Sequence, residues 1–206
     1  MSKKLWPVLI SASLATAVLA GCSGPGRNYK VGVVGFQQCR PDLVLKEIGY
    51  NDIKTRNDAN LCSKKGMPVI FAAELASRLQ QLLKKEVVIV PLDVPYNYNI
   101  RSQIDIARRE KLDYVVGGKI DGYVDPNAVD RARAAGILPY TATLSPTPSA
   151  IPDNAPTVLY VDLKVARTSD GKILSELQYS EEGDKGGDYY TAEVAKKIAG
   201  TIGSYE

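Results

Sequence analysis

Cys22 is the residue whose position most directly implies chemistry. It follows an uncharged apolar run from Leu5 to Ala20, and a short basic head with Lys3 and Lys4 precedes that run. Because the run of about 16 residues is shorter than the roughly 20 that cross a bilayer as a helix, residues 1–21 are expected to be a removable export signal. A thiol directly after a small residue is an accessible nucleophile for lipid attachment. The alternative is an ordinary signal peptide with a chance cysteine.

The stretch Leu19-Ala20-Gly21-Cys22 closely resembles the lipobox of bacterial lipoproteins. The resemblance implies that Cys22 is lipidated. Ser23 differs from the aspartate associated with inner-membrane retention, so the favoured location is the outer membrane, with the protein facing the periplasm. Several acyl chains, palmitate among them, would anchor it durably, because each buried methylene contributes about 0.8 kcal/mol. Residues 22–28 are expected to form a tether that reaches at most about 20 Å.

Two further cysteines, Cys39 and Cys62, remain after the signal. They are too far apart for a Cys-X-X-Cys redox motif. In an oxidising periplasm such an isolated pair favours a disulfide bond. The bond would close a loop of about 24 residues and would stabilise the fold by roughly 3 kcal/mol through the lost entropy of the unfolded chain. Two buried free thiols are the alternative.

Catalytic chemistry has few candidate residues in this chain. There is no histidine, which removes the commonest general base, Ser-His nucleophile activation and most catalytic zinc sites. Asp93, Asp113 and Asp121 lie at or near expected strand ends, but aspartates in such positions more often cap the backbone or face solvent. We therefore expect a protein that is not an enzyme, with no catalytic residue, cofactor or metal.

The charge of the chain argues against nucleic acid as a partner. The formal net charge is +3, and it falls to +1 when Lys3 and Lys4 leave with the signal. No concentrated basic footprint of the kind that binds phosphate backbones remains. Removal of residues 1–21 leaves 185 residues, the size of one domain, which we place at residues 29–204.

The hydrophobic periodicity predicts alternating strands and helices within that domain. The first strand, residues 29–36, is apolar on both faces and is expected to be the central strand. Later strands are expected at residues 87–90, 112–120, 157–168 and 172–179, with the last two joined as a hairpin by Ser169-Asp170-Gly171. The paired glycines Gly117 and Gly118 indicate a bulge or a close backbone approach.

Helices are expected to begin near Pro68, to span residues 100–111 behind an Asn99 cap, to form briefly around residues 128–135, and to follow an Asp188 cap near the end of the chain. Their core faces are predicted from the spacing of apolar residues. These residues are Phe71, Leu75, Leu79, Leu82 and Leu83 in the first helix, Ile104 and Ala107 in the second, and Tyr190, Val194, Ile198 and Ile202 in the last.

The expected fold class is α/β (α+β), with a small mixed sheet, a C-terminal antiparallel hairpin, and helices packed largely on one face. Two segments are expected to be insertions. Residues 37–66 are charged and rich in Asn and Asp, and the two cysteines bracket most of this segment. Residues 123–156 hold six of the twelve prolines. The second insertion could be either a flexible surface loop or an arm that binds a partner.

Four stretches of this pattern resemble a periplasmic domain shared by the penicillin-binding-protein activator lipoproteins, the curli-secretion lipoproteins and the amino-terminal domain of the Tol-system β-propeller protein. They are residues 31–36, 72–79, 112–120 and 161–174, within a similarity that runs from Tyr29 to Ile202. The resemblance implies a domain that binds other envelope proteins or assembles into rings, and it supplies no catalytic residues. The two insertions depart from the shared pattern. A pore is not expected, because residues 123–156 lack the alternation of a membrane hairpin.

The sequence thus favours a membrane-anchored periplasmic lipoprotein that acts as a non-enzymatic accessory or assembly factor for a cell-envelope machine by protein binding. A subunit of an oligomeric ring in a secretion or export apparatus is the alternative. A small-ligand binder or enzyme is the third class. The expected partners are the outer membrane, through lipid on Cys22, and an unidentified envelope protein, with a homo-oligomer possible.

Overall fold

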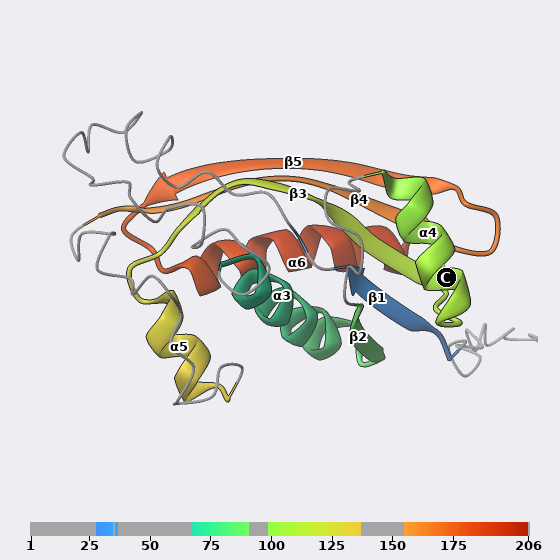
Figure 1. The fold of residues 1–206 in the computed structure, drawn as a ribbon, viewed down its shortest axis with the longest axis horizontal. Coiled ribbons are helices and arrows are strands. Elements are labelled where there is room, and N and C mark those ends of the chain that lie inside the picture. Colours follow the sequence, from blue (N-terminus) through green and yellow to red (C-terminus); the bar gives the residue numbers. More distant parts are fainter. Residues whose placement is uncertain (1–27, 35, 37–66, 91–98, 137–154, 206) are drawn as a thin grey trace, which may run out of the picture.

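The computed structural model describes residues 28–34, 36, 67–90, 99–136 and 155–205, which form a five-stranded mixed sheet and four helices (Figure 1). Within these ranges no helix is long and apolar enough to cross a membrane. The strands are β1 (Lys30–Val34), β2 (Glu86–Val90), β3 (Tyr114–Val124), β4 (Thr157–Arg167) and β5 (Ile173–Gly183). The helices are α3 (Met67–Leu83), α4 (Ile100–Arg109), α5 (Ala128–Ala134) and α6 (Gly187–Gly203).

The strand order across the sheet is β2-β1-β3-β4-β5. Strand β1 pairs in parallel with β2 and β3, whereas β3, β4 and β5 pair in antiparallel fashion. The expected α/β fold with a C-terminal hairpin is confirmed. The prediction that the first strand is central was wrong by one place. Strand β1 is interior and buried, but the middle strand is β3, because the long hairpin adds two strands on its far side.

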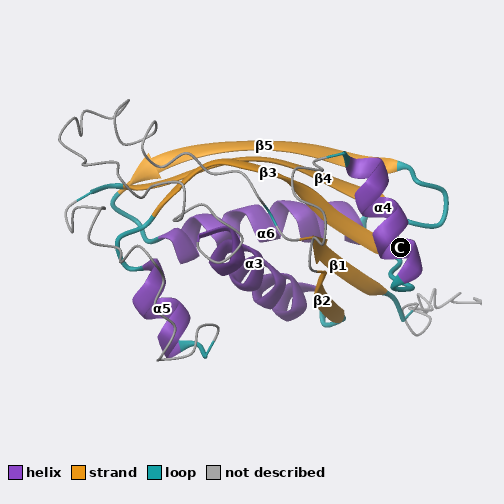
Figure 2. Ribbon diagram, in the orientation of Figure 1, coloured by secondary structure: helices purple, strands orange, loops and turns teal. Residues whose placement is uncertain are grey.

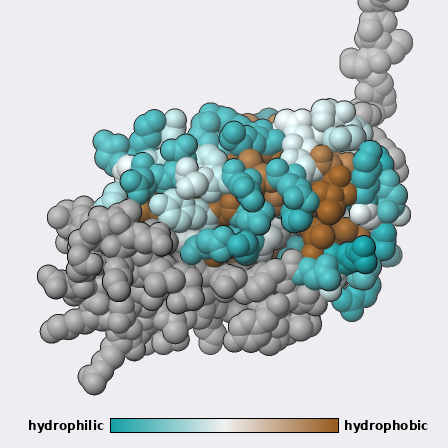
Figure 3. All heavy atoms as spheres, turned by 90° about the horizontal axis from the view of Figure 1, so that it is seen from above, coloured by the Kyte–Doolittle hydropathy of each residue, from teal (hydrophilic) through white to brown (hydrophobic). Residues whose placement is uncertain are grey.

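Most of the helical mass lies on one face of the sheet, as predicted (Figure 2). Helices α3 and α6 cover that face, and the main core lies between them and the inward residues of the strands. Helix α4 covers part of the opposite face, where Ile104 and Ala107 pack on Val115 and Ala166 in a second, smaller core. Seen from above Figure 1, the described surface carries many hydrophilic residues with hydrophobic ones exposed between them (Figure 3).

Helix α3 buries the face that the sequence predicts, with one exception. Phe71, Leu75 and Leu79 are fully buried and Leu83 packs on the core, but Leu82 is 47% exposed. At Lys84 the backbone turns to a φ of 55°, which ends the helix before β2 begins. Helix α4 starts as predicted, because the side chain of Asn99 accepts a hydrogen bond from the backbone nitrogen of Arg101 at 3.0 Å.

The paired glycines of β3 allow a close backbone approach, as predicted. Gly118 has a φ of 145°, and a Cβ there would collide with the backbone oxygen of Asp162. A Cβ at Gly117 would collide with the side chain of Gln103 from α4. The register shift of the β3–β4 pair falls further along, between Ile120 and Gly122. Gly118 therefore has no room for a side chain beside the backbone of β4, and Gly117 has none beside Gln103 of α4.

The hairpin between β4 and β5 also forms as predicted. Gly171 has a φ of 71°, and Asp170 bonds the side chain of Arg167 and the backbone of Lys172 across the turn. Helix α6 begins differently from the prediction. Its N-cap is Gly186, which makes no side-chain cap bond, and Asp188 lies inside the first turn. The reason is that Asp125, 62 residues earlier in the chain, accepts a hydrogen bond from the backbone nitrogen of Gly187 at the start of this helix.

Candidate functional site

The two candidate residues from the sequence that the structure describes, Asp113 and Asp121, do not converge on a reaction centre. Cys22, Cys39, Cys62 and Asp93 lie outside the described residues. Asp113 accepts a hydrogen bond from the backbone nitrogen of Lys30 at 2.9 Å and so joins β3 to β1. Asp121 is half exposed and forms an ion pair with Lys119 at 2.8 Å. Among the described residues, no group of three or more His, Cys, Asp or Glu is placed to hold a metal ion.

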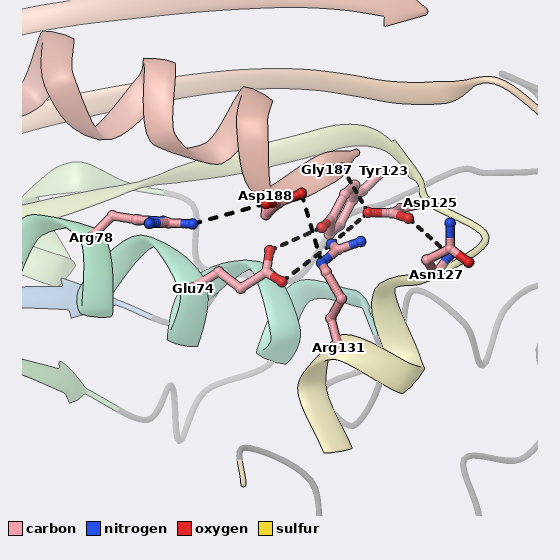
Figure 4. A network of polar contacts seen from close by, with 8 residues as sticks. All are labelled: Glu74, Arg78, Tyr123, Asp125, Asn127, Arg131, Gly187 and Asp188. Carbon is pink, nitrogen blue, oxygen red and sulfur yellow. Dashed lines mark hydrogen bonds and ion pairs between the residues drawn. The ribbon is translucent and has the colours of Figure 1, made fainter. Parts of the chain in front are cut away.

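A polar network at the junction of α3, β3, α5 and α6 is the main buried polar feature that the structure describes (Figure 4). Its centre is Asp125, whose side chain is fully buried just beyond the end of β3. One carboxylate oxygen of Asp125 accepts a hydrogen bond from the backbone nitrogen of Asn127 at 2.9 Å. The other accepts bonds from Arg131 at 2.5 Å and from the backbone nitrogen of Gly187 at 2.8 Å.

Arg131 connects three carboxylates from three parts of the chain. It lies 2.5 Å from Asp125 and 3.2 Å from Glu74, and Asp188 approaches it at 3.9 Å. Burial alone would lower the pKa of Arg131, but the hydrogen bond and charge of Asp125 outweigh that effect and raise it. The guanidinium therefore stays charged and holds α3, α5 and α6 together at one end of the sheet.

Burial raises the pKa of Glu74, although Arg131 opposes the shift. The hydroxyl of Tyr123 donates to Glu74 at 3.2 Å, and burial raises the pKa of this tyrosine well above its ordinary value. Each group that could move a proton is thus bonded within the network. We interpret the network as a structural lock that fixes where α6 begins.

The start of α6 forms one wall of an open groove of about 790 Å³, and the second half of β5 forms the other. The network therefore sets the geometry of this groove, because Gly187 and Asp188 connect it to the first turn of α6. The side chains that line the groove come from β5, from the β5–α6 connection and from α6. Its aromatic and charged lining residues are Tyr179, Glu181, Glu182, Asp184, Lys185, Tyr189, Tyr190, Glu193 and Lys197, and Gln178 also lines it.

The groove combines aromatic surface with acidic groups. Burial raises the pKa of Tyr179 to about 12, and the charges of Glu181 and Glu193 add to the shift. Burial and Glu181 likewise raise the pKa of Tyr190, which is buried against the core. Tyr189 is 42% exposed, and the ammonium group of Lys185 lies 4.1 Å from its ring centroid. An amphipathic aromatic surface of this kind is typical of protein interfaces.

Strand β5 is also an edge strand. It pairs with β4 over its length, and none of the described residues pairs with its other side. Eleven residues of antiparallel strand present an edge of roughly 37 Å. The backbone N–H and C=O groups along such an edge can pair with another extended chain. The groove and the edge together form one surface, which we call the β5–α6 surface.

Comparison with known proteins gives only remote structural likenesses. No protein-family model matches the chain, and no curated protein matches it. Among solved structures, it is similar to PelC dodecamers from Paraburkholderia phytofirmans in two crystal forms, with TM-scores of 0.46 and 0.44 at 13% identity. These matches cover 85% of this chain and 87% and 89% of the PelC chains. TolB from Acinetobacter baumannii matches with a TM-score of 0.39 at 11% identity, over 86% of this chain and 28% of that one.

Sequence reasoning did not find the β5–α6 surface or the network beneath it. A local signal existed at Asp125, because Asp-Pro-Asn before a helix is typical of a turn. Its partner Gly187 is 62 residues away, so the contact cannot be read from local pattern. Gln103 was missed too. Its side-chain amide is fully buried beside Gly117, and neither of its polar atoms has a hydrogen-bond partner among the described residues.

Proposed function

We propose that this chain is a membrane-anchored periplasmic lipoprotein that binds another cell-envelope protein through its β5–α6 surface. In this proposal it acts as a non-enzymatic accessory or assembly factor. The carrying observation is the long edge of β5, which stands beside a groove lined by Tyr179, Tyr189 and Tyr190. An exposed strand edge offers main-chain hydrogen bonds, and tyrosines supply contact area at a low cost in conformational entropy.

The anchor gives this binding its mechanism. Lipid on Cys22 would hold the domain within the short reach of residues 22–28, close to the outer membrane. Confinement to a thin layer raises the effective concentration of the β5–α6 surface near a partner in the same membrane or its machine. Asp113 and Asp121 support a non-enzymatic role, since each is engaged in a structural bond or a surface ion pair.

A ring subunit is the second candidate function. The sheet has two edge strands, β2 and β5, and neither outer edge is paired by another described strand. If β2 of one copy pairs with β5 of the next, the copies join head to tail. Such an arrangement closes into a ring when the rotation between neighbouring copies adds up to a full turn. Near β2, Leu82 and Ile89 are exposed apolar side chains that could contribute to such a contact. Sedimentation of the purified full chain separates a ring from a single-copy adaptor.

Site-specific cross-linking in living cells tests the binding proposal. A photo-reactive amino acid in place of Gln178, which lines the groove, is expected to cross-link to an envelope protein. The matched control places the same group at Glu110, an exposed residue that follows α4 and does not line the groove. Equal cross-linking at both positions, or no protein cross-link at Gln178, would contradict the proposal.

A further inference from the structure

The charge on β5 restricts which extended chain could pair with it. The strand carries Glu176, Glu181 and Glu182 and has no Lys or Arg between Ile173 and Gly183. Glu176 is already paired, because it lies 2.9 Å from Lys164 on the neighbouring strand. The acidic character is therefore concentrated at the end of β5 that borders the groove.

Two acidic side chains there have no ion-pair partner in the described part of the chain. Glu181 and Asp184 line the groove, and neither lies within ion-pair distance of a described Lys or Arg. The neighbouring Glu193 differs, since Lys196 binds it at 2.6 Å. Two cations, Lys185 and Lys197, also line the groove, and Lys185 is engaged with the ring and hydroxyl of Tyr189. The four acidic lining residues, Glu181, Glu182, Asp184 and Glu193, outnumber these two lysines, so the groove carries a net negative charge beside aromatic surface.

The register of the hairpin shows which side chains share a face. Tyr179 and Glu181 lie opposite Val161 and Leu159, whose side chains are in the main core, so both point to the α6 side. Glu182 is on the other side, where the hydroxyl of Tyr160 lies 3.5 Å from it. Along β5, a strand added at its edge would therefore lie beside the ring of Tyr179 and then beside two carboxylates, Glu181 on the α6 face and Glu182 on the opposite face.

A second copy of this chain fits that surface poorly. Pairing β5 with β5 in parallel register, or in antiparallel registers that align Glu176 with Glu181 or Glu182, would bring glutamates of one copy opposite glutamates of the other, which is unfavourable in a strand pair. The opposite edge strand, β2, offers only Glu86 as a charged residue, and Lys30 already binds it at 2.9 Å. Charge complementarity instead favours a partner strand that is basic.

We propose that the β5–α6 surface binds an extended basic segment of another protein, which adds to β5 as a sixth strand. An apolar side chain of the segment packs beside Tyr179, and consecutive Lys or Arg residues lie opposite Glu181 and Glu182 and near Asp184. Main-chain bonds to the β5 edge supply affinity, and the carboxylates select the sequence. This inference rests on the proposed function, because it names the chemistry of the partner at that same surface.

A peptide of about ten residues tests this, since that length matches a typical strand. The probe alternates Val and Thr and is made in two versions, with Lys-Arg-Lys at the amino or the carboxyl end, so that antiparallel or parallel addition places the cations beside Glu181 and Glu182. Each version carries a fluorophore for anisotropy measurements with the purified full chain. We expect saturable binding that weakens about tenfold, or about 1.4 kcal/mol, in Glu181→Lys. Glu110→Lys, which makes the same charge change away from the surface, is expected to bind as the wild type does.

Two control peptides separate strand addition from simple charge attraction. A peptide ending in Glu-Asp-Glu is expected not to bind, and so is the basic peptide with methyl groups on alternate backbone nitrogens. Equal binding of the methylated peptide, equal binding to Glu181→Lys, or no binding of the basic peptide would overturn the inference. If protein cross-links at Gln178 persist in that case, the proposed function stands and only the basic-strand inference fails. If those cross-links are absent as well, both fail.

Discussion

At the scale of single residues, Asp125 is the side chain on which the described network depends most. It accepts hydrogen bonds from Arg131 and from the backbone nitrogens of Asn127 and Gly187, and no part of its side chain reaches solvent. A buried carboxylate is tolerated only where its charge is paired and its oxygens are bonded. The same bonds connect the end of β3 to the start of α6, so one residue links the core to the groove.

We predict that Asp125→Ala destabilises the fold by about 3 kcal/mol, because it leaves Arg131 and a buried backbone N–H with fewer partners. The estimate lies at the low end for a broken buried pair, since the side chain of Arg131 is 27% exposed and Glu74 still binds it. Urea unfolding followed by circular dichroism measures the change. The control is Asp130→Ala on α5, whose side chain is 84% exposed. A loss below that of the control would contradict a structural role for Asp125.

Glu74 makes stability depend on pH in a defined direction. Burial raises its pKa in the folded state above the ordinary value of 4.5. At pH values between the pKa of the unfolded chain and the raised pKa of the folded state, the folded state therefore holds a proton that the unfolded chain has released. The contribution of Glu74 to stability is present below pH 4.5 and is lost as the pH rises through the raised pKa.

Glu74→Gln removes this titration and keeps one oxygen that can accept the bond from Arg131, and its amide nitrogen can donate to the hydroxyl of Tyr123 in place of the bond that Glu74 accepts there. We predict that the wild type loses stability relative to Glu74→Gln as the pH rises from about 4 to about 7. Urea unfolding of both proteins across this range gives the difference at each pH. Glu110→Gln, at an exposed residue that follows α4, is the matched control for the loss of a carboxylate. A flat difference between the wild type and Glu74→Gln would show that the pKa of Glu74 is not raised.

At the scale of elements, two glycines of α6 serve opposite purposes. A Cβ at Gly187 would collide with the carboxylate of Asp125 and with Tyr123, whereas a Cβ at Gly200 would meet nothing within 4 Å. Gly187 therefore lets the helix start approach the network closely. Gly200 lies within the helix, where glycine only adds entropy to the unfolded chain.

We predict opposite effects for the same substitution in this one helix. Gly187→Ala should destabilise the protein by about 1–3 kcal/mol through overpacking. Gly200→Ala should stabilise it by about 0.8–1 kcal/mol through higher helix propensity. Thermal and urea unfolding of the two variants provide the comparison. If both changes stabilise the fold, the close contact at Gly187 is not a constraint on α6.

The elements that sequence reasoning predicted best are those with a strong local signal. The helix faces around Leu75 and Ile198 follow from apolar spacing, and the hairpin follows from alternation and from Gly171. The features that the sequence did not predict share a physical cause. The start of α6, the centre of the sheet and the burial of Asp125 each depend on a partner that is distant in sequence. The groove belongs to the same class, because a local pattern does not specify which helix packs beside β5.

At the scale of the whole molecule, one part of the sheet holds the core and another part is accessible to a partner. One face binds α3 and α6 and holds the main core, whereas the acidic end of β5 leaves backbone and carboxylates accessible. Charged side chains along an edge also hinder self-pairing, so the same glutamates protect the free protein. Cys39 and Cys62 lie outside the described residues, and their disulfide bond stays a prediction.

The last prediction follows from the proposed lipid anchor at Cys22, which would keep the groove close to the membrane. Cys22→Ala should release the protein from the outer membrane, because no acyl chain can be attached at position 22. It should also reduce cross-linking from position 178 by about tenfold or more, since the β5–α6 surface is then diluted through the periplasm and loses its effective concentration near the partner. Cell fractionation and the photo-cross-link yield, measured in the same cells, check both effects.

A matched control separates location from folding. The same protein with Cys22→Ala should give the wild-type urea midpoint, because the core that the structure describes is built from Tyr29 and later residues. If the released protein folds normally but cross-links as well as the anchored one, the partner is reached by diffusion. Membrane confinement then contributes nothing to binding. If Cys22→Ala stays in the membrane fraction, lipid at this residue is not what holds the protein there.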